Sequence, residues 1–274
     1  MITSVLSAIS ASISHSKALR TVVAWVNDWI GGLQYGSYTL KDEAALAASF
    51  CDIDPHQEGG VVIDAGASRG MYTKELLLSG KQFRTLLMIE PAPALGGELT
   101  ALAAQYPFCA FESVAVGANP GIMDLHYDSE GSALGSLYLR DIRHAGIALS
   151  HSVPVPVTTL DELARKYALQ TINYVKLDLE GHELEALKGA SQLLQSHKIK
   201  ALAFEFGGCN IDSRTYIKDF WNLLVDGYGY HLYRQLPRRR LLRLDHYSES
   251  LERFNWQNIL ACARGVNPSW KILH

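Results

Sequence analysis

"VVIDAGASRGMYT" (residues 61–73) predicts a strand, a tight turn and the start of a helix. The apolar run that ends at Asp64 suits a strand buried in a parallel sheet. The chain then turns through Gly66 and Gly70, and a helix is expected from Met71 onward. Such a turn brings backbone N–H groups and a helix N-terminus to a ligand. The stretch therefore predicts a small-molecule site.

Downstream of this stretch, strand-like and helix-like segments alternate. Further strands are predicted at 85–91, 109–117, 172–181 and 199–207, and helices at 69–79, 94–105, 183–196 and about 213–225. Two last strands, near 229–234 and 256–263, suit an antiparallel pair that closes the sheet. Repeated β-α units predict an α/β fold in which a mostly parallel sheet carries helices on both faces. Ligands of such sheets bind at the carboxyl ends of the strands, where the glycine turn, Glu90 and Asp178 are expected.

Two segments stand apart from the β-α pattern. Residues 121–128 and 153–158 are short β stretches around a Gly/Ser-rich piece, and they predict an insertion at the rim of the sheet, where loops carry specificity. Near the start of the chain, apolar residues between 17 and 30 have helical spacing. With no linker or internal repeat, the chain is expected to form an N-terminal helical extension (1–59) and one main domain (60–274).

The composition argues against several classes of protein. The formal net charge of −3 gives no basic field that would recruit nucleic acid or an anionic membrane. The four cysteines are scattered and form no C-x-x-C pair, which argues against zinc and disulfide frameworks and for reduced thiols in a cytoplasmic protein. No apolar run reaches the roughly 18 residues of a transmembrane segment, and the N-terminal segment lacks the basic start of a signal peptide. Peripheral membrane contact through the 17–30 helix and homo-oligomer formation are left open.

The glycine turn does not match the dinucleotide-binding fingerprint. In G-x-G-x-x-G, counted from Gly66, Ser68 and Met71 would occupy the second and third glycine positions. Met71 is large where the helix must pack closely on the strand. A pyrophosphate site, and with it a dehydrogenase, is therefore poorly supported.

S-adenosylmethionine, which carries no phosphate, suits the same residues better. Its ammonium group needs an acid, which Asp64 can supply directly or through a water, and its carboxylate needs N–H donors from the 66–70 turn. Its two ribose hydroxyls suit one bidentate carboxylate, and Glu90 ends the second strand. The adenine is expected near Pro91 and residues 113–115. The predicted cofactor-binding residues are Asp64, Gly66, Ala67, Ser68, Gly70, Tyr72, Thr73, Glu90, Pro91, Ser113, Val114, Ala115 and Asp178.

Longer motifs add a resemblance to a known family. "VIDAGASRGMYT", "LMIEP", "VAVG", "TTLDEL" and above all "YVKLDLEGHELEALKGA" (174–190) resemble the FkbM-type methyltransferases. The resemblance covers about residues 60–206, and "NILACARG" suits the last strand of such a sheet. It implies a Rossmann-like, seven-stranded sheet, S-adenosylmethionine as cofactor, and O-methylation of a sugar, glycan or natural-product alcohol. Ser68 stands where relatives often have Asn. Residues 1–59 and 207–255 match less clearly, so the identity of the acceptor is expected to be encoded there.

The segment "KLDLEGHE" is the predicted chemical centre. Methyl transfer to an alcohol needs a hydroxyl aligned with the methyl donor and a base that removes its proton. Strand alternation places Lys176, Asp178 and Glu180 on one side of the strand. Because three charges there are costly to bury, Lys176 is expected to pair with Asp178 or Glu205. The candidate catalytic residues are Asp178, which is preferred, Glu180 and His182.

Metal and acceptor sites are less sharply indicated. Asp178, Glu180, His182 and Glu205 are hard ligands that could hold a divalent metal, but no spacing is diagnostic and a metal is not favoured. Sugars are commonly bound by aromatic, amide and carboxylate groups. The predicted substrate-binding residues are Tyr35, Ser136, Lys176, Glu205 and Asn210.

A methyltransferase acting on nucleic acid or on protein nitrogen is the nearest alternative. Enzymes that methylate base amino groups usually carry an Asn/Asp-Pro-Pro-aromatic segment after the fourth strand, where this chain has "DLEG" (178–181). Base-directed enzymes also need a basic cleft. A polyketide or lipid alcohol as acceptor and a non-catalytic partner module are left open. A partner module predicts a spoiled cofactor pocket, whereas Asp64 and Glu90 are both in place.

Overall fold

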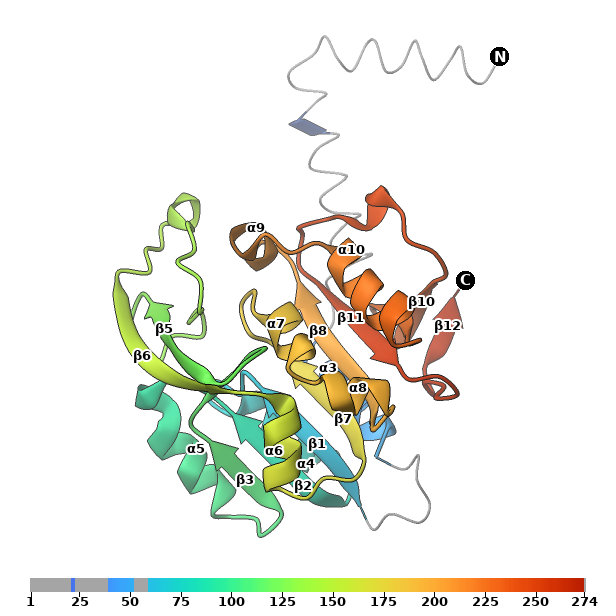
Figure 1. Ribbon diagram of the computed structural model, residues 1–274, viewed down its shortest axis with the longest axis horizontal. Coiled ribbons are helices and arrows are strands. Elements are labelled where there is room, and N and C mark those ends of the chain that lie inside the picture. Colours follow the sequence, from blue (N-terminus) through green and yellow to red (C-terminus); the bar gives the residue numbers. More distant parts are fainter. Residues whose placement is uncertain (1–20, 23–38, 52–58, 274) are drawn as a thin grey trace.

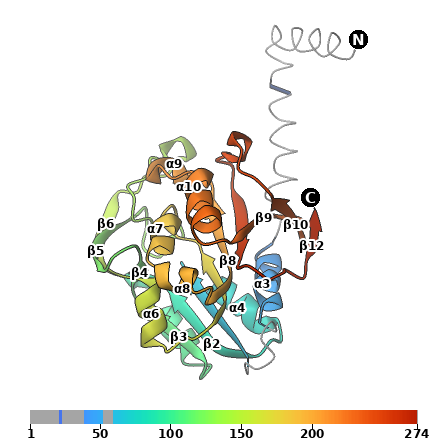
Figure 2. The same cartoon turned by 45° about the vertical axis from the view of Figure 1, so that its right-hand side comes forward.

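One large sheet lies between two layers of helices (Figures 1 and 2). The computed structural model describes residues 21–22, 39–51 and 59–273. The large sheet has the order β12-β10-β9-β11-β8-β7-β1-β2-β3, and a small sheet has the order β4-β6-β5. The large sheet is built from β1 (Gly60–Ala65), β2 (Phe83–Ile89), β3 (Cys109–Glu112), β7 (Ile172–Leu177), β8 (Ile199–Phe206), β9 (His231–Leu236), β10 (Arg240–Leu244), β11 (Gln257–Cys262) and β12 (Lys271–Leu273). The small sheet is built from β4 (Ala115–Val116), β5 (Gly121–Tyr127) and β6 (His151–Thr158).

Helices cover both faces of the large sheet (Figure 1). Side chains from α3 (Leu40–Ser49), α4 (Met71–Leu78) and α5 (Gly96–Ala103) pack into the core on one face. The core of the other face receives α6 (Leu160–Lys166), α7 (Glu183–Lys188), α8 (Ser191–Gln195), α10 (Ile217–Phe220) and the π-helical η3 (Trp221–Gly227). The remaining short elements are α9 (Cys209–Ser213) and the 3₁₀ turns η1 (Pro93–Leu95), η2 (Arg143–Ala145) and η4 (Glu249–Leu251).

The predicted α/β, Rossmann-like class is confirmed, but the expected number of seven strands is wrong. Five strands, β3, β2, β1, β7 and β8, run parallel, and β11 and β9 follow as the predicted antiparallel pair. The sheet then continues through β10, which pairs with β9, and β12, which pairs with β10. The basic segment 237–243, which lies between the two predicted C-terminal strands and for which no strand was predicted, therefore contributes most of β10.

Two predicted elements are divided by close packing. The expected strand 109–117 becomes β3 in the large sheet and β4 in the small one, because Ala115 and Val116 pair with β6 instead of β2. The expected helix 183–196 becomes α7 and α8, separated at Gly189. A Cβ on Gly189 would lie 2.0 Å from the carbonyl oxygen of Gly117, so the two segments meet backbone to backbone. The predicted β insertion is confirmed by β5 and β6.

Alternation along β1 divides the core between the two faces. Val61 and Ile63 pack toward α6 to α8, whereas Val62 packs toward α3 and α4. Every residue of β1 is buried, as predicted for a central parallel strand. The predicted division at residues 59 and 60 stays a prediction, although α3 packs on the same core as the sheet. The helix expected over 17–30 lies outside the described residues, apart from the helical residues 21–22.

Candidate active site

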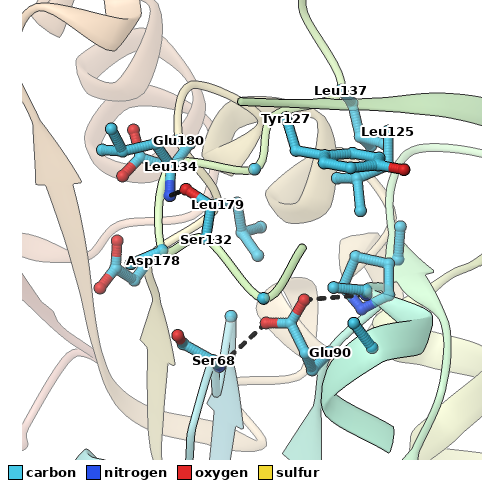
Figure 3. A pocket seen from close by; sticks show the side chains of 18 of the residues that line it. Ser68, Glu90, Leu125, Tyr127, Ser132, Leu134, Leu137, Asp178, Leu179 and Glu180 are labelled. Carbon is cyan, nitrogen blue, oxygen red and sulfur yellow. Dashed lines mark hydrogen bonds between the residues drawn. The ribbon is translucent and has the colours of Figure 1, made fainter. Parts of the chain in front are cut away.

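A cavity of about 420 Å³ opens where the carboxyl ends of β1, β2, β7 and β8 meet the small sheet. Figure 3 shows Glu90 between two walls, with Asp178 and Glu180 on one side and the apolar side chains of Leu125 and Tyr127 on the other. The cavity brings together ten of the residues predicted from sequence. These are Gly66, Ser68, Glu90, Pro91, Val114, Ala115, Asp178, Glu180, His182 and Glu205.

Glu90 is held by the backbone of two neighbouring turns. Its Oε2 accepts a hydrogen bond from the Ser68 N–H and its Oε1 accepts one from the Ala92 N–H, each at 2.9 Å. Ser68 reaches it because its backbone is left-handed, with φ +47°. Burial raises the pKa of Glu90, and the two N–H donors counter that rise. Each carboxylate oxygen retains a second lone pair for a ligand hydroxyl.

The two glycines of the turn are required by packing within the chain itself. Gly66 has φ +82°, and a Cβ there would lie 1.8 Å from the carbonyl oxygen of Asp178. Gly70 has φ +69°, and its Cβ would lie 2.8 Å from Cδ2 of Leu102 on α5. Both positions therefore need glycine for conformation and for close approach. Glycine was expected at these two positions because it leaves space for a ligand. In the structure, glycine is needed there because the turn packs closely on the residue after β7 and on α5.

Asp64 lies beneath the turn and does not line the cavity. Its Oδ2 accepts a hydrogen bond of 2.8 Å from the Thr73 hydroxyl on α4, and Lys176 Nζ lies 3.9 Å from its Oδ1. Burial raises the pKa of Asp64. Among the predicted cofactor-binding residues, those that do not line the cavity are Asp64, Ala67, Gly70, Tyr72, Thr73 and Ser113. In the structure this hydrogen bond joins α4 to β1, and the role of Asp64 in cofactor binding stays a prediction.

Lys176 pairs with Asp178, as predicted, at 2.8 Å. Its ammonium also lies 5.0 Å from the centre of the Tyr72 ring. The Asp178 side chain is 35% exposed, which leaves it accessible from the cavity. The ion pair therefore fixes the orientation of Asp178 and leaves its carboxylate accessible to a ligand in the cavity.

Glu180 is oriented by a turn and an arginine, which corrects the expected alternation along the strand. β7 ends at Leu177, and Glu180 has a left-handed backbone with φ +50°. Its carboxylate forms an ion pair with Arg140, whose Nε lies 3.6 Å from Asp212. Burial, followed by the charge of Asp178, raises the pKa of Glu180 to about 7. Arg140 belongs to the insertion between β5 and β6, and the sequence analysis missed it because nothing local links it to Glu180.

Glu183 shapes the loop that follows β7. Its Oε1 accepts hydrogen bonds from the N–H groups of Leu179 at 2.8 Å and Gly181 at 3.2 Å. The side chain is fully buried, and burial raises its pKa to about 7. The sequence analysis did not assign this role to Glu183, because neither hydrogen bond belongs to a capping box.

His182 is buried beside Tyr138. Its Nδ1 lies 3.2 Å from the Tyr138 hydroxyl, and a Cβ on Gly117 would lie 3.0 Å from its Nε2. Burial lowers the pKa of His182 to about 4, so the imidazole is neutral at neutral pH. The pKa of Glu205 is shifted upward instead, because burial and the charge of Asp178 hold it well above the usual range. Burial therefore favours the uncharged form of Glu205.

Three of the predicted acceptor residues do not line this cavity, and one lies outside the described residues. The Ser136 hydroxyl donates to the carbonyl oxygen of Glu180 at 2.8 Å. Asn210 is fully buried, where it accepts from the Gly207 N–H and donates to the Thr215 hydroxyl, each at 2.8 Å. These contacts build the loops around the site. Lys176 lines a neighbouring cavity, and Tyr35 lies outside the described residues.

Three further findings concern the described residues. Within residues 21–22, 39–51 and 59–273, no three His, Cys, Asp or Glu side chains converge as a metal site. In the same part of the chain, no helix has the length and apolarity needed to span a membrane. All four cysteines are free thiols.

A Rossmann-like sheet with a buried acid directly after β2, facing a cavity at the strand ends, is the arrangement of Rossmann-like nucleotide-binding enzymes. The family model "Methyltransferase FkbM domain" matches residues 64–232, more than half of the chain. The chain belongs to the FkbM methyltransferase family.

Solved structures give only distant likenesses. An FkbM methyltransferase from Methylobacillus flagellatus KT is 17% identical with a TM-score of 0.48, and the match covers 78% of this chain and 47% of that one. This chain therefore spans about half the length of that relative. An rRNA methylase from Streptococcus thermophilus is 10% identical (TM-score 0.40; 81% and 93% covered), and fibrillarin from Aeropyrum pernix is 13% identical (TM-score 0.40; 81% and 75% covered). No curated protein sequence matches.

Proposed function

We propose that the protein is an S-adenosylmethionine-dependent O-methyltransferase whose acceptor is a hydroxyl of a sugar, glycan or sugar-containing small molecule. The observation that carries the proposal is the Glu90 carboxylate, which two backbone N–H groups hold at the edge of a 420 Å³ cavity. Membership of the FkbM family supports methyl transfer as the reaction class.

The residues around the cavity fit the proposed cofactor. Glu90 offers one free lone pair on each oxygen, which suits the two adjacent hydroxyls of a ribose. Leu125 and Tyr127 face it across the cavity and offer apolar surface to an adenine (Figure 3). The volume lies within the roughly 300–1,000 Å³ of small-molecule sites. When bound, S-adenosylmethionine supplies a methyl group carried on a sulfonium.

Asp178 is the best placed of the three candidate bases. As the acceptor oxygen gains the methyl group it must lose its proton, and a carboxylate within hydrogen-bond reach accepts that proton. Asp178 lines the cavity, is partly exposed and is oriented by Lys176. Glu180 is engaged by Arg140, and the low pKa of His182 makes its imidazole a weak base. We therefore assign proton removal to Asp178, with Arg140 and Glu183 maintaining the loop around it.

Titration calorimetry with S-adenosylhomocysteine tests the proposal, with NAD as the control ligand and each titration run with and without Mg²⁺. We expect binding of S-adenosylhomocysteine alone, without dependence on Mg²⁺. Transfer of radiolabelled methyl from S-adenosylmethionine to a panel of glycosides and free polyols then tests the acceptor class. Binding of NAD in preference to S-adenosylhomocysteine, or transfer only to nitrogen acceptors, would contradict the proposal.

A further inference from the structure

A second cavity, of about 230 Å³, adjoins the first, and Asp178 and Glu205 line both. Asp178 follows β7 and Glu205 lies on β8, so both cavities open at the ends of the same two central strands. In Figure 3 the Asp178 carboxylate points away from Glu90 and Tyr127. The two residues therefore form a shared wall between the proposed cofactor cavity and a second compartment.

The remaining walls of this second cavity come from segments outside the cofactor-binding motifs. Glu43 lies on α3, Gln235 on β9 and Asn258 on β11. Asn258 is opposite Glu205 in the β8–β11 ladder and donates a side-chain hydrogen bond to Glu43. Thus α3 and β9, whose segments match the family less clearly in sequence, enclose the space next to Asp178 together with β11.

Gln235 indicates that the second cavity is built for a ligand. Its side chain is 1% exposed, and its Nε2 has no hydrogen-bond partner among the described residues. A buried donor that stays unpaired costs about 1–3 kcal/mol. Because Gln235 lines the cavity, a ligand oxygen there would satisfy this donor.

The lining chemistry suits a neutral molecule with several hydroxyls. Lys176 is neutralised by Asp178, while Gln235 and Asn258 contribute uncharged amides. Trp256, 38% exposed, lies at the edge of the cavity and donates a hydrogen bond to Glu205, so its ring offers an apolar face beside polar groups. The volume is below the roughly 300 Å³ at which drug-sized sites begin, which suits a single sugar ring.

We infer that the second cavity binds one sugar ring of the acceptor, with Gln235 and Asn258 hydrogen-bonding its hydroxyls and Asp178 meeting the hydroxyl to be methylated. This inference rests on the proposed function and adds the location and chemistry of the acceptor site. It assigns specificity to Glu43, Gln235, Asn258 and Trp256. Asp178 lines both the proposed cofactor cavity and the second cavity, which is the position required of a base that acts between a methyl donor and an alcohol.

Binding measurements that need no turnover test the inference. The full chain is examined by saturation-transfer NMR with a panel of methyl hexosides and 6-deoxyhexosides, with and without S-adenosylhomocysteine. We expect at least one glycoside to bind and Gln235→Leu to weaken it about tenfold or more, as for loss of a buried hydrogen bond. Gln195→Leu, the same change at an exposed position of α8, is the matched control and should leave binding unchanged. Trp256→Ala, at a partly exposed position, gives a second test should Gln235→Leu fold poorly.

Affinity for S-adenosylhomocysteine, measured on the same samples, separates this inference from the proposed function. Both variants should bind it as the wild type does. Glycoside binding that persists in Gln235→Leu and Trp256→Ala, glycoside binding that S-adenosylhomocysteine displaces, or binding of no glycoside would overturn the inference. A protein that binds glycosides through Gln235 but does not bind S-adenosylhomocysteine would uphold the sugar site and refute methyl transfer.

Discussion

Replacement of Glu90 by alanine tests the cofactor site most directly. The carboxylate is 8% exposed, accepts N–H groups from Ser68 and Ala92, and retains two lone pairs toward the cavity. The variant removes both acceptors that are proposed to hold the ribose hydroxyls. It also releases the two backbone turns that the carboxylate joins.

The loss of affinity follows from the charge on the acceptor. Hydrogen bonds to a charged group contribute about 1.5–3 kcal/mol, whereas neutral ones contribute about 0.5–1.5 kcal/mol. Glu90→Ala should therefore weaken S-adenosylhomocysteine binding by about 1.5–3 kcal/mol, or about 10- to 150-fold in Kd. Because burial raises the pKa of Glu90, the wild-type affinity should fall as the pH is lowered through that pKa and the carboxylate is neutralised. In Glu90→Ala, the affinity should not show this dependence on pH.

Titration calorimetry of wild type, Glu90→Ala and Glu249→Ala at several pH values measures both effects. Glu249 is an exposed acid that does not line the cavity, so its removal controls for the change in net charge. Thermal unfolding of each variant shows whether the Ser68 and Ala92 turns remain folded. Wild-type affinity in a folded Glu90→Ala protein would refute the assignment of Glu90 to the ribose.

Asp178→Asn should retain S-adenosylhomocysteine binding but lower kcat about 10²–10⁴-fold, which is the range of general-base contributions. Normal turnover in a radiolabelled methyl-transfer assay would show that Glu180 or His182 is the general base instead. Alanine in a left-handed backbone conformation costs roughly 1–2 kcal/mol. Gly66→Ala should destabilise the protein by more than this, because the added Cβ would also overlap the Asp178 carbonyl. Gly80→Ala, with φ +72° and no atom within 4 Å of the added Cβ, isolates the backbone cost, and equal losses in denaturant unfolding would contradict the clash. Glu183 has a pKa raised from 4.5 to about 7 in the folded state, so the folded protein binds the extra proton and stability falls as the pH rises through that window. Glu183→Gln should remove this fall, on the order of 3 kcal/mol, and an unchanged pH dependence of unfolding would show that Glu183 is not its source.

The parts of the site that could be predicted from sequence are encoded within short segments. Gly66 and Gly70 predict the turn between β1 and α4, and the position of Glu90 directly after an apolar strand marks it as a candidate site residue. Parallel strands place their carboxyl ends at one edge of the sheet, so Glu90 and Asp178 could be brought together without knowledge of side-chain contacts. The alternation argument failed at Glu180 because the strand ends at Leu177.

Contacts between distant segments could not be predicted in this way. Arg140 and Glu180 are 40 positions apart, and the insertion that carries Arg140 has no periodicity that would fix its place. Gln235 and Asn258 lie in strands with no motif that marks a site, and only the strand order β9-β11-β8 brings them near Glu205. β10 was missed because its arginines resemble those of a solvated loop.

This division between local and distant contacts matches the proposed division of labour in the site. In the proposed site, a methyl donor common to a family is held by one β-α-β unit, in which Glu90 follows Ser68 by 22 positions. An acceptor that differs between relatives requires residues that can change without disturbing that unit. Gln235 and Asn258 meet this condition, because they lie on β9 and β11, beyond β8, and neither lines the cavity that holds Glu90. Substitutions at Gln235 should therefore change which sugar binds while the cofactor affinity stays constant.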